Sequence, residues 1–599
     1  MAKLTDLSDD VLYLVLQHLY PDRTYSLCIL RRISTHFNVF AESVLYRDVF
    51  LIDDASHEQA TYYLMRRLSD PNDNISHYVR TLQVKSFQGD DKSYCINTQL
   101  LLAALNGIHK LHFFSWECDL PIPDILLEVL HGRFPDLRLG VSIKSLDQPV
   151  LSSPRLQRLA VSIPHSDCVQ WNWLKGTLTD SQNLRALTID AHLAYPEKAL
   201  LTSERKVIES GTRTDVMCNG SSAASSHGST ALDEPSTGRT QLPLKTEDRL
   251  PSLEELDIRT KTYDLDAQHC TLLLECMDWT KLRRLTLGPS NPRVYFGVFK
   301  DQLPQLEALD FAYHYEYQSY NSRYIGTLTA CTDFMASAPR LKDLTIRCDI
   351  IDFKATFWGA LVQTHGDTLK SLSIQGRTPT SEAPVIKGDM NPFLACFESL
   401  ETLDLVLQTH YPNSTGCKFC PSGSHGVSNT YLDTIPVILS LRSLRILLRV
   451  NHGQRSLYNT IGQHSRCAIR KIWTDYLNQF RVAGWDSQLE SFSLTPWRWE
   501  PSSPHAGEDG RRRIAHASHI VFESKMVGER LMIRPRGLRS VEPSFYRKEW
   551  QETDDSLNEV FVLDEPDHAK QELPSRKNFL SMCSRRIEKA LSPFSVLSS

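Results

Sequence analysis

Residues 282–287 read Leu282-Arg283-Arg284-Leu285-Thr286-Leu287, and this short pattern decides the fold. It has the form apolar-x-x-apolar-x-apolar, so its last three residues alternate between apolar and polar side chains. Such alternation is typical of a short strand with one buried face and one exposed face. Clear copies begin at Leu156, Leu184, Leu253, Leu282, Leu306, Leu341, Leu369 and Leu400, and weaker copies begin at Val79, Ile108, Phe134, Leu441 and Leu489.

Most neighbouring copies begin 22 to 35 residues apart, which is near the period of leucine-rich repeats. Apolar stretches of helical character, such as 270–279, lie between the predicted strands. One strand and one helical return per repeat would build a curved solenoid, in which each repeat buries its neighbour's face. A single copy would fit a buried strand or helix of an unrelated α/β core, but many copies in order favour the solenoid.

This part of the chain resembles the irregular leucine-rich repeats that often follow an F-box. The family frequently places Asn or Cys eight residues after the first leucine, where the side chain bonds backbone in the turn. The corresponding positions here hold Pro164, His192, Lys261, Ser290, His314, Asp349, Arg377 and Gln408. The usual turn ladder is therefore absent, and we expect repeats of varying shape.

The first fifty residues predict three short helices. Ser8 can cap the first helix, whose acidic first turn is followed by apolar residues at helical spacing. Residues 7–12 (Leu-Ser-Asp-Asp-Val-Leu), 33–34 (Ile-Ser) and 45–47 (Leu-Tyr-Arg), together with Phe37, resemble an F-box at that family's spacing. One departure is Ser8, where the family usually has proline.

The resemblance implies that this motif binds the small Skp-type adaptor of a cullin–RING (SCF) ubiquitin ligase, and through the adaptor a cullin. By position, the implied adaptor contacts are Leu4, Leu7, Leu12, Leu16, Leu19, Ile33 and Phe37. The alternative is that these side chains only form the interior of a small helical bundle. Three short helices bury too little surface to be very stable alone, so such a unit is expected to dock on something.

We therefore expect an α/β fold, with an N-terminal three-helix F-box at 1–50 and an irregular leucine-rich-repeat-like α/β solenoid at 51–500. Residues 202–249 contain a Ser-rich stretch with few aromatic side chains, which predicts a disordered insert. Residues 409–430 are expected to form a second loop. Residues 501–599 are expected to form a C-terminal tail that is partly disordered.

The composition excludes several classes of protein. The 599 residues carry 66 Lys and Arg against 71 Asp and Glu, a net charge of −5, which excludes a protein that is basic overall and coats nucleic acid. No secretory signal is visible, and no apolar run approaches the ~20 residues that cross a bilayer. Fourteen widely spaced cysteines predict reduced thiols. We expect a soluble protein, cytoplasmic or nuclear or both, without nucleic-acid or membrane partners.

Polar side chains flank the buried positions of the predicted strands, and in a solenoid they would line the concave face. The candidates for binding a protein substrate are Asp257, Arg259, Arg284, Asp310, Tyr315, Tyr317, Arg347 and Asp404. Their mixed charges favour a protein partner over a phosphate backbone. Tyrosines are favoured in binding hot spots, but half-buried tyrosines in a turn, and a merely solvated charged face, explain the same residues.

Motifs of enzymes are absent from the sequence. It contains no G-x-S-x-G elbow, no phosphate loop, no G-x-G-x-x-G and no H-E-x-x-H. Cys417 and Cys420, flanked by His410 and His425, have the C-x2-C spacing that suits tetrahedral zinc. The fourth ligand lacks its usual spacing, and two free thiols in a Ser/Gly-rich loop are the plainer interpretation. We expect no catalytic residue, no cofactor and no metal, so the chain is not expected to be an enzyme.

The resemblance thus implies the substrate-recognition subunit of an SCF-type ubiquitin ligase, with a protein substrate that the sequence does not identify. Two alternatives stay open. One is an F-box scaffold that acts with the adaptor outside a ligase, and the other is a protein-interaction module made of the repeats alone.

Overall fold

The computed structural model of the chain describes most of residues 35–451 and shorter pieces at either side. The described residues are 32, 35–53, 58–87, 91–144, 146, 148–164, 168–192, 240–258, 263, 265–288, 292–313, 323–338, 340–348, 350–351, 355–375, 385–386, 393–394, 396–409, 438, 440–451, 489, 491–499, 520–527, 530–537 and 560–562. They belong to two compact units. The first comprises residues up to 253 with 258–264 and 275–278, and the second comprises 254–257, 265–274 and the chain from 279 onward.

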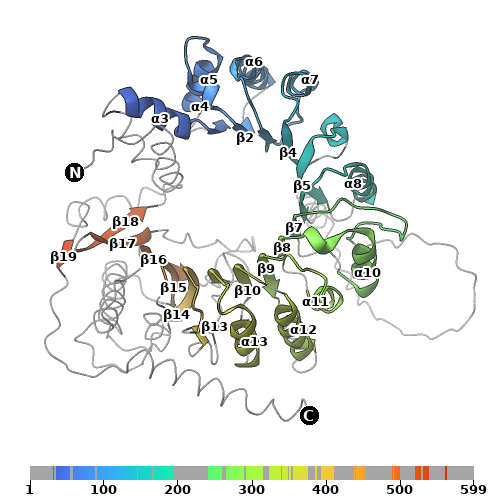
Figure 1. Cartoon of the computed structure of the whole chain (residues 1–599), viewed down its shortest axis with the longest axis vertical. Helices are drawn as coiled ribbons and strands as arrows, with labels where there is room; N and C mark the ends of the chain where they lie inside the picture. The colour runs from blue at the N-terminus through green and yellow to red at the C-terminus, as the bar shows by residue number, and fades with distance from the viewer. Residues whose placement is uncertain are drawn as a thin grey trace, which may run out of the picture. The chain divides into compact units, whose positions relative to one another are not determined.

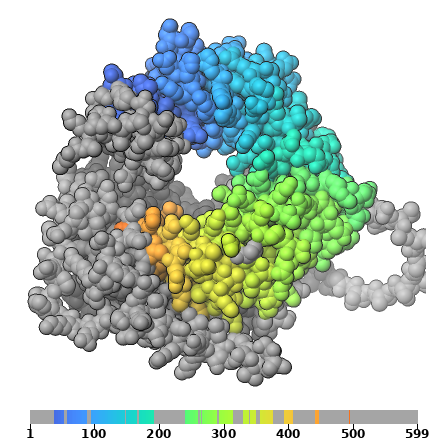
Figure 2. Space-filling view, viewed as in Figure 1, coloured from blue at the N-terminus to red at the C-terminus, as the bar shows by residue number. Residues whose placement is uncertain are grey.

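Strands and helices alternate in the first unit (Figure 1). Its elements are α3 (Thr35–Leu45), β1 (Asp48–Asp53), α4 (Glu58–Ser69), α5 (Ile75–Tyr78), β2 (Thr81–Phe87), α6 (Asp91–Gly107), β3 (Phe113–Trp116), α7 (Asp124–Arg133), β4 (Arg138–Ile143), η2 (Pro149–Ser152), β5 (Leu156–Pro164), α8 (Cys168–Asp180) and β6 (Ala186–His192). Strands β1 to β6 pair in chain order, and every pair is parallel. Parallel neighbours need a crossover, which the intervening helices supply. Helices α4, α6 and α7 contact one another in order, and their side chains close into a continuous surface (Figure 2).

The second unit repeats this arrangement. Its elements are η3 (Trp279–Lys281), β8 (Arg284–Leu287), α11 (Arg293–Val298), β9 (Ala308–Tyr313), α12 (Arg323–Ser337), β10 (Asp343–Cys348), β11 (Ile350–Ile351), α13 (Ala355–His365), β12 (Ser371–Gln375), β13 (Val385–Ile386), β14 (Thr402–Thr409), β15 (Ser443–Asn451), β16 (Ser491–Trp499), β17 (Ile520–Val527), β18 (Arg530–Gly537) and β19 (Val560–Val562). The main parallel order is β8-β9-β10-β12-β14-β15-β16. Strands β17, β18 and β19 continue it as antiparallel neighbours. Strand β7 (Glu255–Ile258) and helix α10 (Ala267–Cys276) each contribute residues to both units.

The described chain is therefore a mixed α/β protein with mainly parallel strands, and the predicted fold class is confirmed at this level. The repeated leucines form the core of the second unit. Leu285, Leu309, Leu344, Leu372, Leu403 and Leu444 occupy paired positions on consecutive strands, and each is 1% exposed or less. Burying one such side chain contributes about 1.5–3 kcal/mol.

One of the weaker predicted copies has the wrong phase. The copy that begins at Ile108 places Phe113 on the buried face of a strand, but β3 buries Phe114 and Trp116 and leaves Phe113 half-exposed. The copy that begins at Phe134 keeps its buried face, because Leu137 and Leu139 are both buried, but pairing with Phe114 gives Leu139 the second position of the pattern. A run of adjacent apolar residues fits the pattern in two phases. Pairing with buried residues of the neighbouring strand determines which of the two phases is adopted.

The last part of the predicted disordered insert, residues 240–249, is ordered. Leu242 and Leu244 are buried, and Thr240 forms a bridge with Tyr263. Residues 240–249 therefore pack on the first unit, because two leucines anchor them. The rest of that insert and nearly all of loop 409–430 lie outside the described residues.

Two histidines are buried in the helices of the second unit. His365, at the end of α13, is 0% exposed, and its Nε2 lies 2.9 Å from the carbonyl oxygen of Met335. Its Nδ1 accepts a hydrogen bond from the amide of Leu341 at 3.3 Å, so Nε2 carries the proton. His269 on α10 is 1% exposed, and burial lowers its pKa from 6.5 to about 4, although Asp266 opposes the shift.

Within the described residues, no helix combines the length and the apolar character that crossing a bilayer requires.

Candidate functional site

A row of polar side chains crosses six neighbouring strands of the second unit. We call it the polar row, and it consists of Thr286, Asp310, Thr345, Ser373, Asp404 and Arg445. Each member is the register partner of the next. Each also lies between two buried apolar residues of its own strand, because side chains alternate along a strand. At about 4.8 Å per strand, the row spans roughly 24 Å.

Arginines on the following strands neutralise the carboxylates of the polar row. Asp310 forms an ion pair with Arg347 of β10. Asp404 lies 3.6 Å from Arg445, and the two side chains are 19% and 67% exposed. Each carboxylate is thus more buried than its arginine. The guanidinium groups retain N–H donors, which could bind acceptor groups of a partner.

Hydrogen bonds fix the centre of the row. The Nε2 of Gln375 donates to the hydroxyl of Ser373 at 2.7 Å, and Ser373 is 6% exposed. Burial raises the pKa of Asp404, while Arg445 and a hydrogen bond with Ser373 oppose the shift. A row that is held in one geometry by neighbouring side chains binds a partner without first being ordered.

The structure brings together only some of the residues predicted to bind a substrate. Asp310 and Arg347 form a pair, and Asp404 lies in the same row. Arg284 is exposed at the start of β8, two residues before Thr286 of the row, and Asp257 is half-buried on β7. Arg259, Tyr315 and Tyr317 lie outside the described residues, so their roles stay predictions.

Most of the predicted adaptor contacts also lie outside the described residues. These are Leu4, Leu7, Leu12, Leu16, Leu19 and Ile33. Phe37 is described, and it lies on the buried side of α3 with 5% of its surface exposed. Its contact with an adaptor stays a prediction. Cys417, Cys420, His410 and His425 are not described either, and the described residues contain no cluster of three metal-ligating side chains.

Sequence reasoning missed a second charged array at the start of the strands. Its members, which we call the paired ladder, are Arg283, Glu307, Lys342, Lys370 and Glu401. The amide of each donates to the carbonyl of the member before it, at 2.7 to 2.8 Å. Ion pairs join the side chains of Arg283 and Glu307 at 2.9 Å, Lys342 and Glu307 at 3.0 Å, and Lys370 and Glu401 at 3.1 Å.

The bonds from Arg283 and Lys342 lower the pKa of Glu307, although burial opposes them. The signal for this array was present in the sequence. All five residues stand second in their copy of the pattern, directly after the first leucine, whereas the sequence reasoning considered only positions inside the strands.

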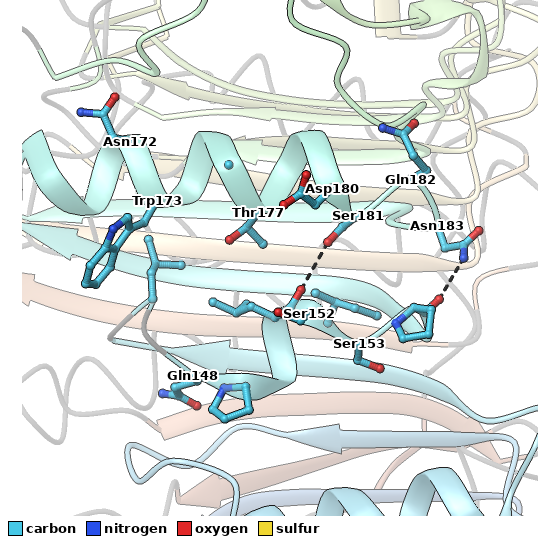
Figure 3. Close-up of a pocket in the computed structure, with 16 residues that line it drawn as sticks. Gln148, Ser152, Ser153, Asn172, Trp173, Thr177, Asp180, Ser181, Gln182 and Asn183 are labelled. Carbon is cyan, nitrogen blue, oxygen red and sulfur yellow. Dashed lines mark hydrogen bonds between the residues drawn. The ribbon is translucent and has the colours of Figure 1, made fainter.

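The first unit contains a hollow of about 710 Å³ beside η2 and α8 (Figure 3). Neutral polar groups line much of it, and Trp173 at its edge is 47% exposed. Two hydrogen bonds hold its wall: Ser181 Oγ donates to the carbonyl of Leu151 at 3.5 Å, and Asn183 Nδ2 donates to that of Pro154 at 2.9 Å. Both polar groups already serve backbone carbonyls, so they hold the wall rather than offer a ligand a new partner.

No known family model and no curated protein matches this chain.

Proposed function

We propose that the chain is the substrate-recognition subunit of an SCF-type ubiquitin ligase. In this proposal, an F-box at 1–50 docks the Skp-type adaptor, and an irregular leucine-rich-repeat solenoid at 51–500 binds a protein substrate for ubiquitination. One observation supports it above the others: the last helix of the F-box-like motif is fixed to the first strand of the sheet.

The connection between that helix and the sheet is short. Helix α3 ends at Leu45, and β1 begins at Asp48. Ala41 and Val44 on one side of α3 are 2% exposed or less, and the helix contacts α5. A partner bound by the motif would therefore be held at a constant orientation to the sheet.

Side chains reinforce this connection. The Nη1 of Arg67 donates to the hydroxyl of Tyr46 at 2.9 Å, and Tyr46 lies within the link. The Nε of the same arginine donates to Asp73 at 2.7 Å. The hydrogen bond with Asp73 raises the pKa of Arg67, although burial opposes it. One guanidinium thus ties the link to α4 and to the loop before α5.

A rigid connection is what a substrate-recognition subunit needs. Such a subunit raises the rate of ubiquitin transfer by holding a substrate lysine near the conjugating enzyme, and it supplies no catalytic residue. A flexible connection would lower the effective concentration of the lysine. The polar row supports the second half of the proposal, since it offers a partner protein ion pairs and hydrogen bonds over roughly 24 Å.

The test is binding of a purified Skp-type adaptor to the full chain. The variant Leu7→Asp with Leu12→Asp places charges at two predicted contacts, where an unpaired buried charge is costly. A matched control, Gln17→Asp with Thr24→Asp, adds the same charge at polar positions of the same segment. We expect the wild type and the control to bind, and the leucine variant to lose binding at unchanged circular dichroism.

Two results would refute the proposal. If the wild-type chain does not bind the adaptor, the N-terminal helices are a cap of the repeats and the chain is a repeat-only interaction module. If the adaptor binds but the complex recruits no cullin, the chain is an F-box scaffold outside a ligase. Recruitment of both supports the proposal, and the search then moves to substrates.

A further inference from the structure

The first unit carries positive charges where the second unit carries the paired ladder. Arg47, Arg80, His112 and Arg138 stand at the starts of β1, β2, β3 and β4, and we call them the basic ladder. Backbone hydrogen bonds join them in order. The backbone amide of Arg80 donates to the carbonyl oxygen of Arg47 at 2.9 Å. In the same way, the amide of His112 donates to the carbonyl of Arg80 at 2.8 Å, and the amide of Arg138 donates to the carbonyl of His112 at 2.9 Å. Three arginines and one histidine therefore lie on four consecutive strands within about 14 Å.

The basic ladder is not neutralised from within. Lys110, in the loop before β3, adds a further exposed cation. In the described part of the chain, no carboxylate lies within ion-pair distance of Arg47, Lys110 or Arg138. Burial lowers the pKa of His112, and Lys110, Arg80 and Arg138 lower it further, although Asp136 opposes the shift. The neighbouring cations therefore favour the neutral form of the imidazole.

The second unit shows the arrangement that stability alone favours. There the equivalent positions combine Arg283, Glu307, Lys342, Lys370 and Glu401, and three ion pairs join them. Like charges on neighbouring strands destabilise a sheet. In the first unit, like charges occupy the equivalent positions at the starts of the strands, although they destabilise the sheet. These charges therefore have a role other than stabilising the fold.

We infer that the basic ladder is a binding surface for an acidic polypeptide segment, rich in Asp and Glu. Guanidinium groups bind carboxylates through paired, charge-assisted hydrogen bonds. A stripe of about 14 Å accommodates four or five extended residues at about 3.3 Å each. Nucleic acid fits less well, because its binding commonly uses about 6–10 phosphate contacts and the whole chain carries a net charge of −5. This inference does not depend on the F-box.

The experiment is fluorescence anisotropy of the full chain with a labelled, glutamate-rich decapeptide. The test variant is Lys110→Glu with Arg138→Glu, because neither side chain bonds another described group. The matched control is Arg66→Glu with Lys300→Glu, which makes the same change in net charge at exposed positions outside the basic ladder. Arg80 is left intact, since it donates to the carbonyls of His77 and Val79.

We expect the test variant to bind the peptide about tenfold more weakly than the wild type, in line with modest energies for exposed ion pairs. The control should bind as the wild type does, and rising salt should weaken both equally. If the test variant does not fold, Lys110→Gln with Arg138→Gln replaces it and should show a smaller loss in the same direction.

Three results would overturn the inference. The first is equal peptide binding by the wild type and the test variant. The second is equal binding of the peptide with glutamine in place of every glutamate. The third is tighter binding of a single-stranded RNA of similar length that the test variant loses, which would make the partner a nucleic acid.

Discussion

Acid should weaken the second unit through the buried imidazole of His269. The pKa of this side chain is about 4 in the folded chain and about 6.5 in the unfolded chain. Between these two pH values the unfolded chain binds a proton that the folded chain does not, so stability falls as the pH falls. Above pH 6.5 both states are neutral, and the histidine adds no pH dependence.

The size of the effect follows from the two pKa values. One pKa unit corresponds to about 1.4 kcal/mol, so the full shift is worth about 3 kcal/mol below pH 4. From pH 7 to pH 5 the same linkage relation predicts a loss of about 2 kcal/mol. This exceeds the uncertainty of an unfolding experiment, and pH 5 still lies above the range in which most carboxylates titrate.

The assay compares the wild type with His269→Leu, which cannot titrate. Hydrogen exchange of the α10 amides, corrected for the intrinsic pH dependence of exchange, measures the free energy of opening at pH 7 and pH 5. The loss on acidification should be about 2 kcal/mol smaller in the variant. The control is His109→Leu, which removes an exposed imidazole and should leave the pH dependence of α10 unchanged. Equal losses in His269→Leu and the wild type would refute the reasoning.

Four further predictions concern packing, hydrogen bonding and one ion pair. A Cβ on Gly107 would lie 2.1 Å from a carbonyl oxygen of α4, so Gly107→Ala should destabilise the first unit by about 1–3 kcal/mol in urea unfolding. Gly132→Ala, where the Cβ meets nothing within 4 Å, should stabilise its helix by about 0.5–1 kcal/mol. His365→Phe leaves a buried amide and a buried carbonyl without partners and should lower the melting temperature, at a cost of about 2–4 kcal/mol; an unchanged melting temperature would contradict the two hydrogen bonds. Arg347→Met should cost only about 1 kcal/mol in urea unfolding, because the ion pair with Asp310 is partly exposed.

Strands of the second unit were predictable where apolar and polar residues alternate in only one possible way. Leu285 and Leu344, for example, are separated from other apolar residues by charged or hydroxyl side chains, and both lie in the core. The first strand was not predicted, since Val49 and Leu51 lack a leucine three residues before them. They pair with Leu82 and Val84, so they belong to the sheet although residues 48–50 had been assigned to the F-box.

The candidate surface was predictable in part. Period-2 alternation alone places Asp310 and Asp404 on the exposed face of their strands, and both lie in the polar row. Their ion pairs with Arg347 and Arg445 could not be predicted from the sequence. These arginines belong to neighbouring strands, and only the register of the strands brings each one next to its carboxylate. The arrays at the strand starts need the same cross-strand information.

Repeats of nearly the same leucine pattern pose a problem for a folding chain, because any strand could pair with the wrong neighbour. The charges of the paired ladder disfavour some of these wrong pairings, because like charges on neighbouring strands repel each other. If β9 were skipped, Arg283 would meet Lys342, and if β14 were skipped, Lys370 would meet Arg442. The one adjacent pair of lysines, Lys342 and Lys370, is flanked by glutamate on both sides. Residues that contribute little to the final stability can thus disfavour these two errors while the sheet assembles.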